Sequence, residues 1–225
     1  ARGKQPIICG GTGLYLNALI MHPEMSDEGR NDDVRASLSS FAEKHGTEAL
    51  HDKLAAVDPE SAEAIHPANV RRVIRALEIY ETTGITKSEW DRRSREIPPE
   101  YGLTSFVLDY LDRDILYSRI DRRVDIMLEN GLEAEARALY TTGKLGRNTS
   151  AAQAIGYKEF GEYFAGEITL EEVAGKIKQA TRRYAKRQIT WFKRDTAAIK
   201  LHPDENAPEI KTTAELADEA MNCLE

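Results

Sequence analysis

Apolar residues recur at helical spacing along most of this chain. Between residues 70 and 80 they fall three or four positions apart, which predicts one face of an amphipathic helix. Asn69 precedes this segment as a candidate N-cap, and Gly84 follows it as a candidate C-cap. Similar patterns predict helices over residues 34–41, 47–57, 59–65, 86–95, 113–130, 133–140, 151–164 and 170–192.

Two short apolar runs do not follow the helical spacing. Pro6 to Cys9 predicts a buried strand, and Ser105 to Tyr110 predicts a second core strand, followed by Asp112 as a helix cap. Strands mixed with many helices indicate an α/β fold that is helical for most of its length. We expect a core made of residues 1–25 and 105–225, interrupted by a helical insertion over residues 26–104.

A glycine-rich turn, Gly10-Gly11-Thr12-Gly13, joins the first expected strand to a helix that begins near Leu14. Glycines let a ligand approach the backbone, and a helix N-terminus favours anions. The spacing matches neither the GxxxxGK[ST] loop nor the GxGxxG fingerprint. Two interpretations remain open, namely a ligand site that uses the Thr12 hydroxyl, and a tight turn whose glycines serve packing alone.

Composition indicates a globular protein of one large domain or two smaller ones. The 225 residues are 41% hydrophobic and 31% charged. Cys9 and Cys223 lie far apart, so we expect neither a disulfide framework nor a zinc site, and a cytosolic location fits. We find no apolar run of membrane-spanning length and no signal peptide at the start of the sequence, so no membrane partner is expected.

Charge is segregated along the chain. The net charge of −7 argues against a protein that binds nucleic acid over its whole surface. The segment 176–194 nevertheless contains cations and aromatic residues with no acidic residue among them. We expect its cations to meet a polyanion, because uncompensated like charges repel, and its aromatic residues to be buried rather than stacked on bases. The cations are Lys176, Lys178, Arg182, Arg183, Lys186, Arg187, Lys193 and Arg194.

Two other arginine clusters allow a structural and a functional interpretation. Arg71 and Arg75 share a helix face and could clamp phosphates, or Arg75 could pair with Glu78 on a solvated face. The arginines between residues 119 and 123 follow the second expected strand, where guanidinium groups could reach diphosphate oxygens or serve only the fold.

Five sequence blocks in order make a specific match to a known family. The blocks are residues 8–15, 66–78, 119–125, 154–159 and 185–194. With them the chain resembles the tRNA dimethylallyltransferases, of bacterial type because no zinc-finger motif follows. Members of this family transfer a dimethylallyl group from dimethylallyl diphosphate to the exocyclic N6 amine of the adenosine on the 3′ side of the anticodon.

The resemblance implies a P-loop NTPase-like parallel-sheet core, incomplete here, with a helical insertion that helps to grip the anticodon arm. It implies that Thr12 lies beside the amine of the flipped adenine, and that Arg119 and Arg122 bind the diphosphate. It implies Mg²⁺ bound with the diphosphate substrate, with no metal ligands from the protein, and a monomer in the cytoplasm. The implied tRNA contacts are Arg35, Arg71, Arg72, Arg75, Ile155, Gly156, Tyr157, Lys158, Lys186, Arg187, Gln188, Thr190, Trp191, Lys193 and Arg194.

The chain departs from the family pattern in one respect. The GxTxSGK[ST] phosphate loop and the Asp-Ser motif with the general-base aspartate do not occur in these 225 residues. We therefore expect an amino-terminally truncated piece of the enzyme that is inactive alone. Two alternatives remain, a tRNA-binding module without activity and a small-molecule kinase related through the P-loop fold.

Overall fold

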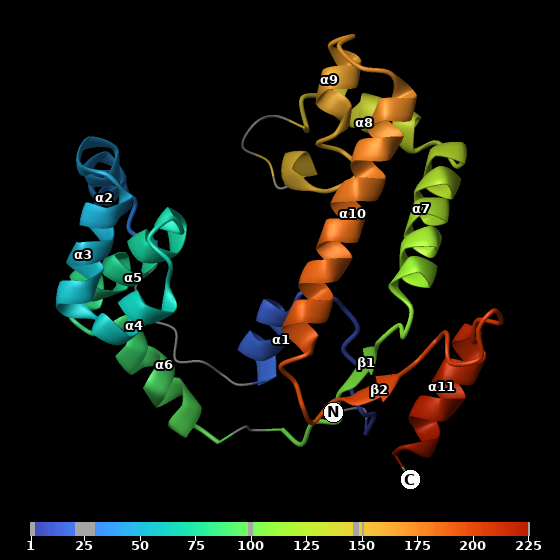
Figure 1. The fold of residues 1–225 in the computed structure, drawn as a ribbon, viewed down its shortest axis with the longest axis horizontal. Helices are drawn as coiled ribbons and strands as arrows, with labels where there is room; N and C mark the ends of the chain where they lie inside the picture. The colour runs from blue at the N-terminus through green and yellow to red at the C-terminus, as the bar shows by residue number, and fades with distance from the viewer. Residues whose placement is uncertain (1–2, 21–29, 99–100, 146–148, 150, 225) are drawn as a thin grey trace. The chain divides into compact units, whose positions relative to one another are not determined.

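The computed structural model describes residues 3–20, 30–98, 101–145, 149 and 151–224 (Figure 1). The chain divides into two compact units. Unit 1 comprises residues 1–13 and 104–225, and unit 2 comprises residues 14–103. The predicted insertion boundary at residue 26 lies outside the described residues.

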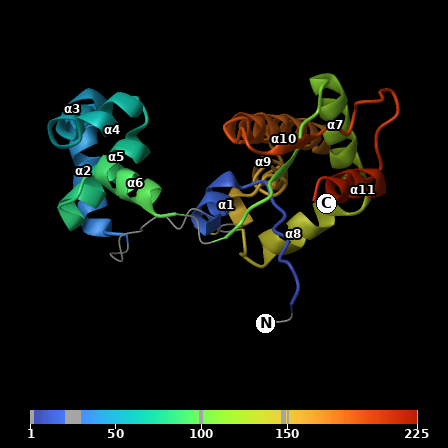
Figure 2. The same ribbon diagram turned by 90° about the horizontal axis from the view of Figure 1, so that it is seen from below.

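Unit 2 is helical (Figure 2), and residues between 34 and 77 form one apolar core. Leu50, Leu54 and Val73 are fully buried there, because the apolar faces of neighbouring helices meet. The helices predicted over residues 34–95 are confirmed. The helices are α1 (Gly13–Ile20), whose first residue belongs to unit 1, α2 (Asp32–His45), α3 (Thr47–Val57), α4 (Pro59–Ala64), α5 (Val70–Thr83) and α6 (Lys87–Glu96).

The ends of helix α5 test the two predicted caps. Gly84 has the left-handed conformation, with φ of 72°, and its amide donates to the Tyr80 carbonyl, so the predicted C-cap is confirmed. Asn69 occupies the N-cap position, as predicted, but its side chain accepts no capping hydrogen bond. Its φ of −89° and ψ of 60° lie outside the extended region that N-cap residues usually adopt.

A buried carboxylate holds the start of α2 against α5. The Glu78 side chain is 1% exposed, and it accepts hydrogen bonds from Arg35 Nε, Arg75 Nη1 and the Asn31 amide at 2.8, 2.8 and 2.9 Å. Burial acts to raise the pKa of Glu78, but the hydrogen bonds from Arg35 and Arg75 outweigh burial and lower the pKa to about 2. The Arg75–Glu78 pair inferred from the sequence therefore forms, with a carboxylate that is buried rather than solvated.

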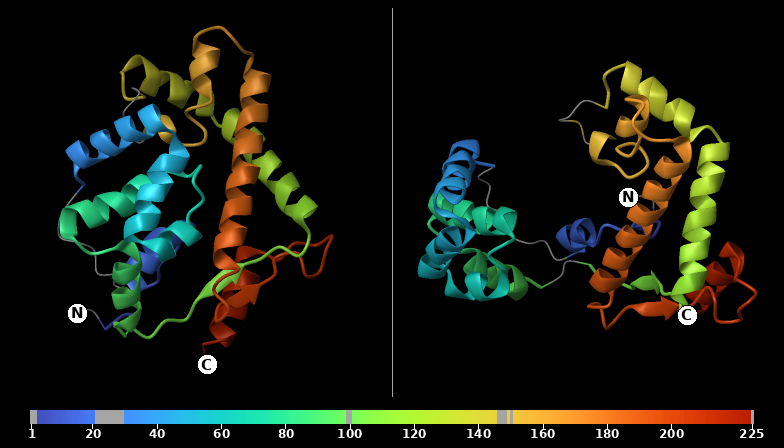
Figure 3. Two further views of the ribbon diagram at one scale, coloured as in Figure 1. Left: turned by 60° about the vertical axis from the view of Figure 1, so that its left-hand side comes forward. Right: turned by 45° about the horizontal axis from the view of Figure 1, so that its top comes forward.

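Unit 1 also contains several helices (Figure 3), and residues between 124 and 177 form a second apolar core. Phe160 and Val173 are fully buried there, with Val124 and Ile177 beside them. The helices predicted over residues 113–130, 133–140 and 170–192 are confirmed. The helical elements are α7 (Arg113–Glu129), α8 (Leu132–Thr141), the 3₁₀ turn η1 (Ala151–Gln153), α9 (Phe160–Phe164), α10 (Leu170–Phe192) and α11 (Thr213–Asn222).

The sheet of unit 1 consists of two parallel strands in the described part of the chain. Strand β1 (Phe106–Leu108) pairs with β2 (Ile199–Leu201), which confirms the second predicted strand. The buried strand predicted over residues 6–9 is wrong, because this segment is not a strand and Ile7 is 92% exposed. Within the described residues the sheet contains β1 and β2 alone, and residues 6–9 pair with neither strand.

The junction between β1 and α7 is fixed from both sides. Asp112 caps α7 by accepting from the Asp114 amide, as predicted. The buried Asp204 accepts from the amides of Leu111 and Asp112 at 2.9 and 2.7 Å. Burial opposes ionisation of Asp204, but these backbone hydrogen bonds prevail and keep its pKa below the ordinary value. The direction in which α7 leaves the sheet is therefore set by a residue 92 positions away from the cap.

Two parts of unit 1 differ from the expectation. A continuous helix over residues 151–164 is wrong, because Gly156 has φ of 100° and the chain turns there before α9 begins. Strand β2 and helix α11 were not predicted. The three residues of β2 carry too short a pattern to be distinguished from a loop, and the acidic residues of the tail obscured the capping box of α11 at Thr212 and Glu215.

We expect Glu78→Gln to lower the free energy of unfolding by about 2 kcal/mol at neutral pH, because the amide cannot satisfy both guanidinium groups. A carboxylate with a lowered pKa contributes stability that is complete above about 4.5 and is lost as the pH falls toward about 2. When urea unfolding is measured at several pH values in this range, the free energy of unfolding should therefore fall less with decreasing pH in Glu78→Gln than in the parent protein. Glu81→Gln, at an exposed position on the same helix, is the control, and equal pH dependence in all three proteins would contradict the expectation.

Candidate functional site

Helix α10 is the element that organises the candidate site. Thr169 and Glu172 form a capping box at its start, so the helix begins at a defined residue. Val173 and Ile177 are buried in the core of unit 1, where they fix the rotation of the helix about its axis. The cations selected from the sequence begin at Lys176, next to Ile177, and extend to Arg194, two residues beyond the end of the helix.

The first cations of this helix are neutralised by acidic residues of other elements. Lys176 pairs with Glu162, and Lys178 Nζ lies 2.6 Å from Asp125 Oδ1. Arg182 Nη1 donates to both carboxylate oxygens of Asp121, at 2.5 and 2.6 Å. The expectation that all eight cations lack counter-charges is therefore wrong for three of them. The sequence could not reveal these acids, because they lie 14, 53 and 61 residues away along the chain.

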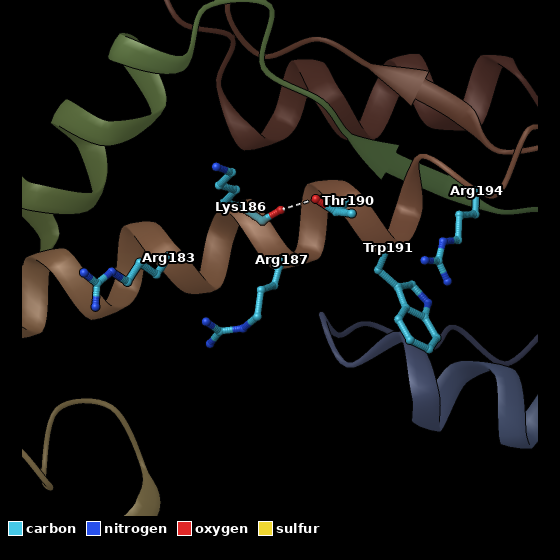
Figure 4. A pocket seen from close by; sticks show the side chains of 6 residues that line it. All are labelled: Arg183, Lys186, Arg187, Thr190, Trp191 and Arg194. Atoms are coloured by element: carbon cyan, nitrogen blue, oxygen red, sulfur yellow. Dashed lines mark hydrogen bonds between the residues drawn. The ribbon is translucent and has the colours of Figure 1, made fainter. Parts of the chain in front are cut away.

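The remaining cations of the segment 176–194 have no ion pair within the described residues. They are exposed, and most of them line one hollow of about 350 Å³ together with Thr190 and the half-buried Trp191 (Figure 4). Thr190 Oγ1 donates to the Lys186 carbonyl at 2.9 Å, and the Arg187 guanidinium lies 5.4 Å from the centre of the Tyr184 ring. The five unpaired cations are Arg183, Lys186, Arg187, Lys193 and Arg194, of which all but Lys193 line the hollow.

This hollow has the chemistry of a phosphate site. Guanidinium forks bind phosphate oxygens in pairs, and cations without a protein partner gain most from a polyanion. The indole of Trp191 offers an aromatic surface in the same hollow. The arrangement therefore suits a nucleic-acid backbone better than a neutral ligand.

The glycine turn lies against α10. Gln188 Nε2 donates to the Gly11 carbonyl at 3.0 Å. A methyl group added at Gly13 would lie 1.9 Å from Trp191 Nε1, which is closer than any real contact. Gly11 and Gly13 therefore allow close approach of α10, as the packing interpretation of the turn required. Thr12, between them, is exposed and available to a ligand.

The other predicted residues of unit 1 lie apart from these contacts. Arg119 and Arg122 are exposed on α7, and none of the described contacts joins them to Thr12 or to the hollow. In the turn after η1, the Gly156 amide donates to Glu159 Oε2 at 2.9 Å, and the Tyr157 hydroxyl donates to Glu135, a hydrogen bond that raises the pKa of Tyr157. Lys158 is exposed beside them, and Ile155 packs against the core.

The predicted residues of unit 2 fall into two groups. Arg71 and Arg72 are exposed on α5, without an ion pair among the described residues. Arg35 and Arg75 each form an ion pair with Glu78. The Arg75–Glu78 pair was an alternative that the sequence offered, whereas the burial of Glu78 and its pairing with Arg35, 43 residues away, were not predicted.

The described residues offer no protein-made metal centre. No group of three or more His, Cys, Asp or Glu side chains among them could hold a metal ion. The expectation that Mg²⁺ accompanies the diphosphate substrate without protein ligands stays a prediction. No helix in the described part of the chain is long and apolar enough to span a membrane.

Comparison with known proteins identifies the class of protein. The family model described as IPP transferase matches residues 1–195, which is most of the chain. The chain therefore belongs to the IPP transferase family, and its resemblance to the tRNA dimethylallyltransferases is confirmed.

Individual relatives agree with this assignment. The tRNA dimethylallyltransferase of Halalkalibacterium halodurans is 50% identical over 192 residues, which cover 85% of this chain and 60% of the relative. That of Geobacillus thermodenitrificans is 50% identical over 194 residues, covering 86% of this chain and 60% of the relative. This chain thus spans about 60% of the length of these curated relatives.

Solved structures of related enzymes share the fold. The tRNA isopentenylpyrophosphate transferase of Bacillus halodurans matches with a TM-score of 0.57 and 41% identity, covering 95% of this chain and 63% of that one. A eukaryotic dimethylallyltransferase, described as acting on tRNA, matches with a TM-score of 0.69 and 29% identity over 92% of this chain and 55% of its own.

We expect Gly13→Ala to displace the Trp191 indole, because the added methyl group and the ring cannot occupy the same space. In a Trp90→Phe background, where Trp191 is the only tryptophan, its emission maximum should move to longer wavelength. Gly10→Ala is the matched control, since a methyl group there meets nothing within 4 Å. Identical spectra for the two variants would contradict the close packing of Trp191 on Gly13.

Proposed function

We propose that this chain acts in the prenylation of tRNA, the transfer of a dimethylallyl group from dimethylallyl diphosphate to the N6 amine of the adenosine on the 3′ side of the anticodon. The names of its relatives support the reaction class. The observation that carries the proposal for this chain is the set of unpaired cations around Trp191 on α10, which provides a surface for the backbone of the anticodon arm.

In this proposal the residues of unit 1 have separate tasks. The cations of the hollow neutralise phosphates of the RNA, and the Thr12 hydroxyl contacts the amine of an adenine turned out of its stack. The amine nitrogen forms a bond to the dimethylallyl carbon while the bond from that carbon to the diphosphate oxygen breaks. Arg119 and Arg122 stabilise the negative charge on the departing diphosphate, and the amine gives its proton to a base, the role that the resemblance assigns to the aspartate of the Asp-Ser motif.

Unit 2 has proposed tRNA contacts of its own, the exposed Arg71 and Arg72, together with Arg35 and Arg75, which are paired with Glu78. We also propose that β1 and β2 belong to a P-loop NTPase-like sheet, which is consistent with their parallel pairing across a long helical connection.

Adjacent arginines on α10 give a matched test of RNA binding. Arg183 is unpaired and lines the hollow, whereas Arg182 is held by Asp121. We expect Arg183→Gln to weaken binding of unmodified tRNA and to make the slope of log K against log salt shallower by about one unit, as for one lost phosphate contact. Arg182→Gln removes the same charge one residue away, and it should leave that slope nearly unchanged. Equal effects of the two variants would reject a specific role for the hollow.

The missing motifs give a second test. Because neither GxTxSGK[ST] nor Asp-Ser occurs in these 225 residues, we expect no transfer of label from dimethylallyl diphosphate to unmodified tRNA by this polypeptide alone. The Halalkalibacterium halodurans relative serves as positive control. Turnover at a rate similar to that of the relative would contradict the roles that the resemblance assigns to these motifs. Salt-dependent tRNA binding without transfer is the result that we expect.

A further inference from the structure

Two residues of α10 that the resemblance assigned to tRNA are engaged within the protein. Gln188 uses its amide donor on the Gly11 carbonyl, at 3.0 Å. Trp191 lies so close to Gly13 that its ring leaves no room for a Cβ atom there. These contacts fall on the two neighbours of Thr12 in the chain, and both come from one turn of one helix.

The helix that makes these contacts is itself held firmly. Ile177 is buried in the core of unit 1, and Arg182 is fixed by both oxygens of Asp121. Three of the unpaired cations of the hollow, Arg183, Lys186 and Arg187, lie on the same stretch of helix as Gln188, and Trp191 also lines that hollow (Figure 4). An α-helix rises about 1.5 Å per residue and is stiff over such a distance, so the cations and the contacts to the turn keep a constant separation.

We infer that Gln188 and Trp191 are positioning residues, which hold the Thr12 turn at a fixed distance from the phosphate-binding cations of α10. The inference rests on the proposed function, in which one RNA molecule contacts both the Thr12 turn and the hollow. An RNA whose phosphates occupy the hollow then presents one nucleotide to Thr12, chosen by its distance along the backbone. Neither residue needs to contact a base for this selection.

Gln188→Met tests the inference, because methionine keeps the length of the side chain and removes the donor. We expect the backbone order parameters of Gly11, Thr12 and Gly13, measured by ¹⁵N relaxation, to fall from about 0.85 to below about 0.6. The affinity for an unmodified anticodon stem-loop RNA should stay within about twofold of the starting value, because no phosphate contact is lost. The control is Gln179→Met, at an exposed position on the same helix, which should change neither quantity.

The possible results separate a positioning role from a ligand role. A loss of RNA affinity as large as that of Arg183→Gln, with unchanged order at Thr12, would make Gln188 an RNA ligand and overturn the inference. Unchanged order together with unchanged affinity would also overturn it. If the parent protein binds no RNA, the proposed function fails, and a loss of order in Gln188→Met would still support the contact between α10 and the turn.

Trp191→Phe in the same measurements examines the second contact. The smaller ring withdraws from Gly13, so we expect the order parameter of Gly13 to fall more than that of Gly11. A larger fall of the order parameter at Gly11 than at Gly13, or no change at either glycine, would show that Trp191 does not position the turn. Gln188 would then be the positioning residue without Trp191.

Discussion

The packing of α10 on α7 is the interaction on which the candidate site depends. Ile177 enters a core that Val124 of α7 helps to form, and Asp121 and Asp125 of α7 neutralise Arg182 and Lys178 of α10. These ion pairs are partly exposed, so each contributes modestly to stability, while the apolar contacts supply most of the free energy. Together they fix which cations remain unpaired.

This division of charge explains how one helix serves two purposes. In the first half of α10 the cations form ion pairs with acidic residues of other elements. In its last turns the cations are exposed and have no ion pair within the described residues. Leaving like charges together costs free energy unless an anion compensates them, which is the general reason to associate such clusters with phosphate. In unit 2 the buried carboxylate of Glu78 likewise forms ion pairs with two arginines, Arg35 and Arg75.

Sequence reasoning predicted what local physics determines. The helical spacing over residues 70–80, the cap at Asp112 and the full extent of α10 follow from side chains close in sequence. It could not predict that Asp121 neutralises Arg182 or that Gln188 reaches Gly11, since these partners lie 61 and 177 residues apart. The strand expected over residues 6–9 failed for a related reason, because a strand requires a neighbour that its own pattern does not specify.

Strand β2 and the Asp204 clamp have a practical consequence for protein engineering. Both lie after residue 195, where the match to the family model ends. A polypeptide trimmed to that boundary would keep every residue assigned to RNA binding. It would nevertheless expose the hydrogen-bonding edge of β1 and leave the amides of Leu111 and Asp112 without their acceptor. Unpaired strand edges promote association between chains, so the family boundary is a poor place to end a soluble expression product.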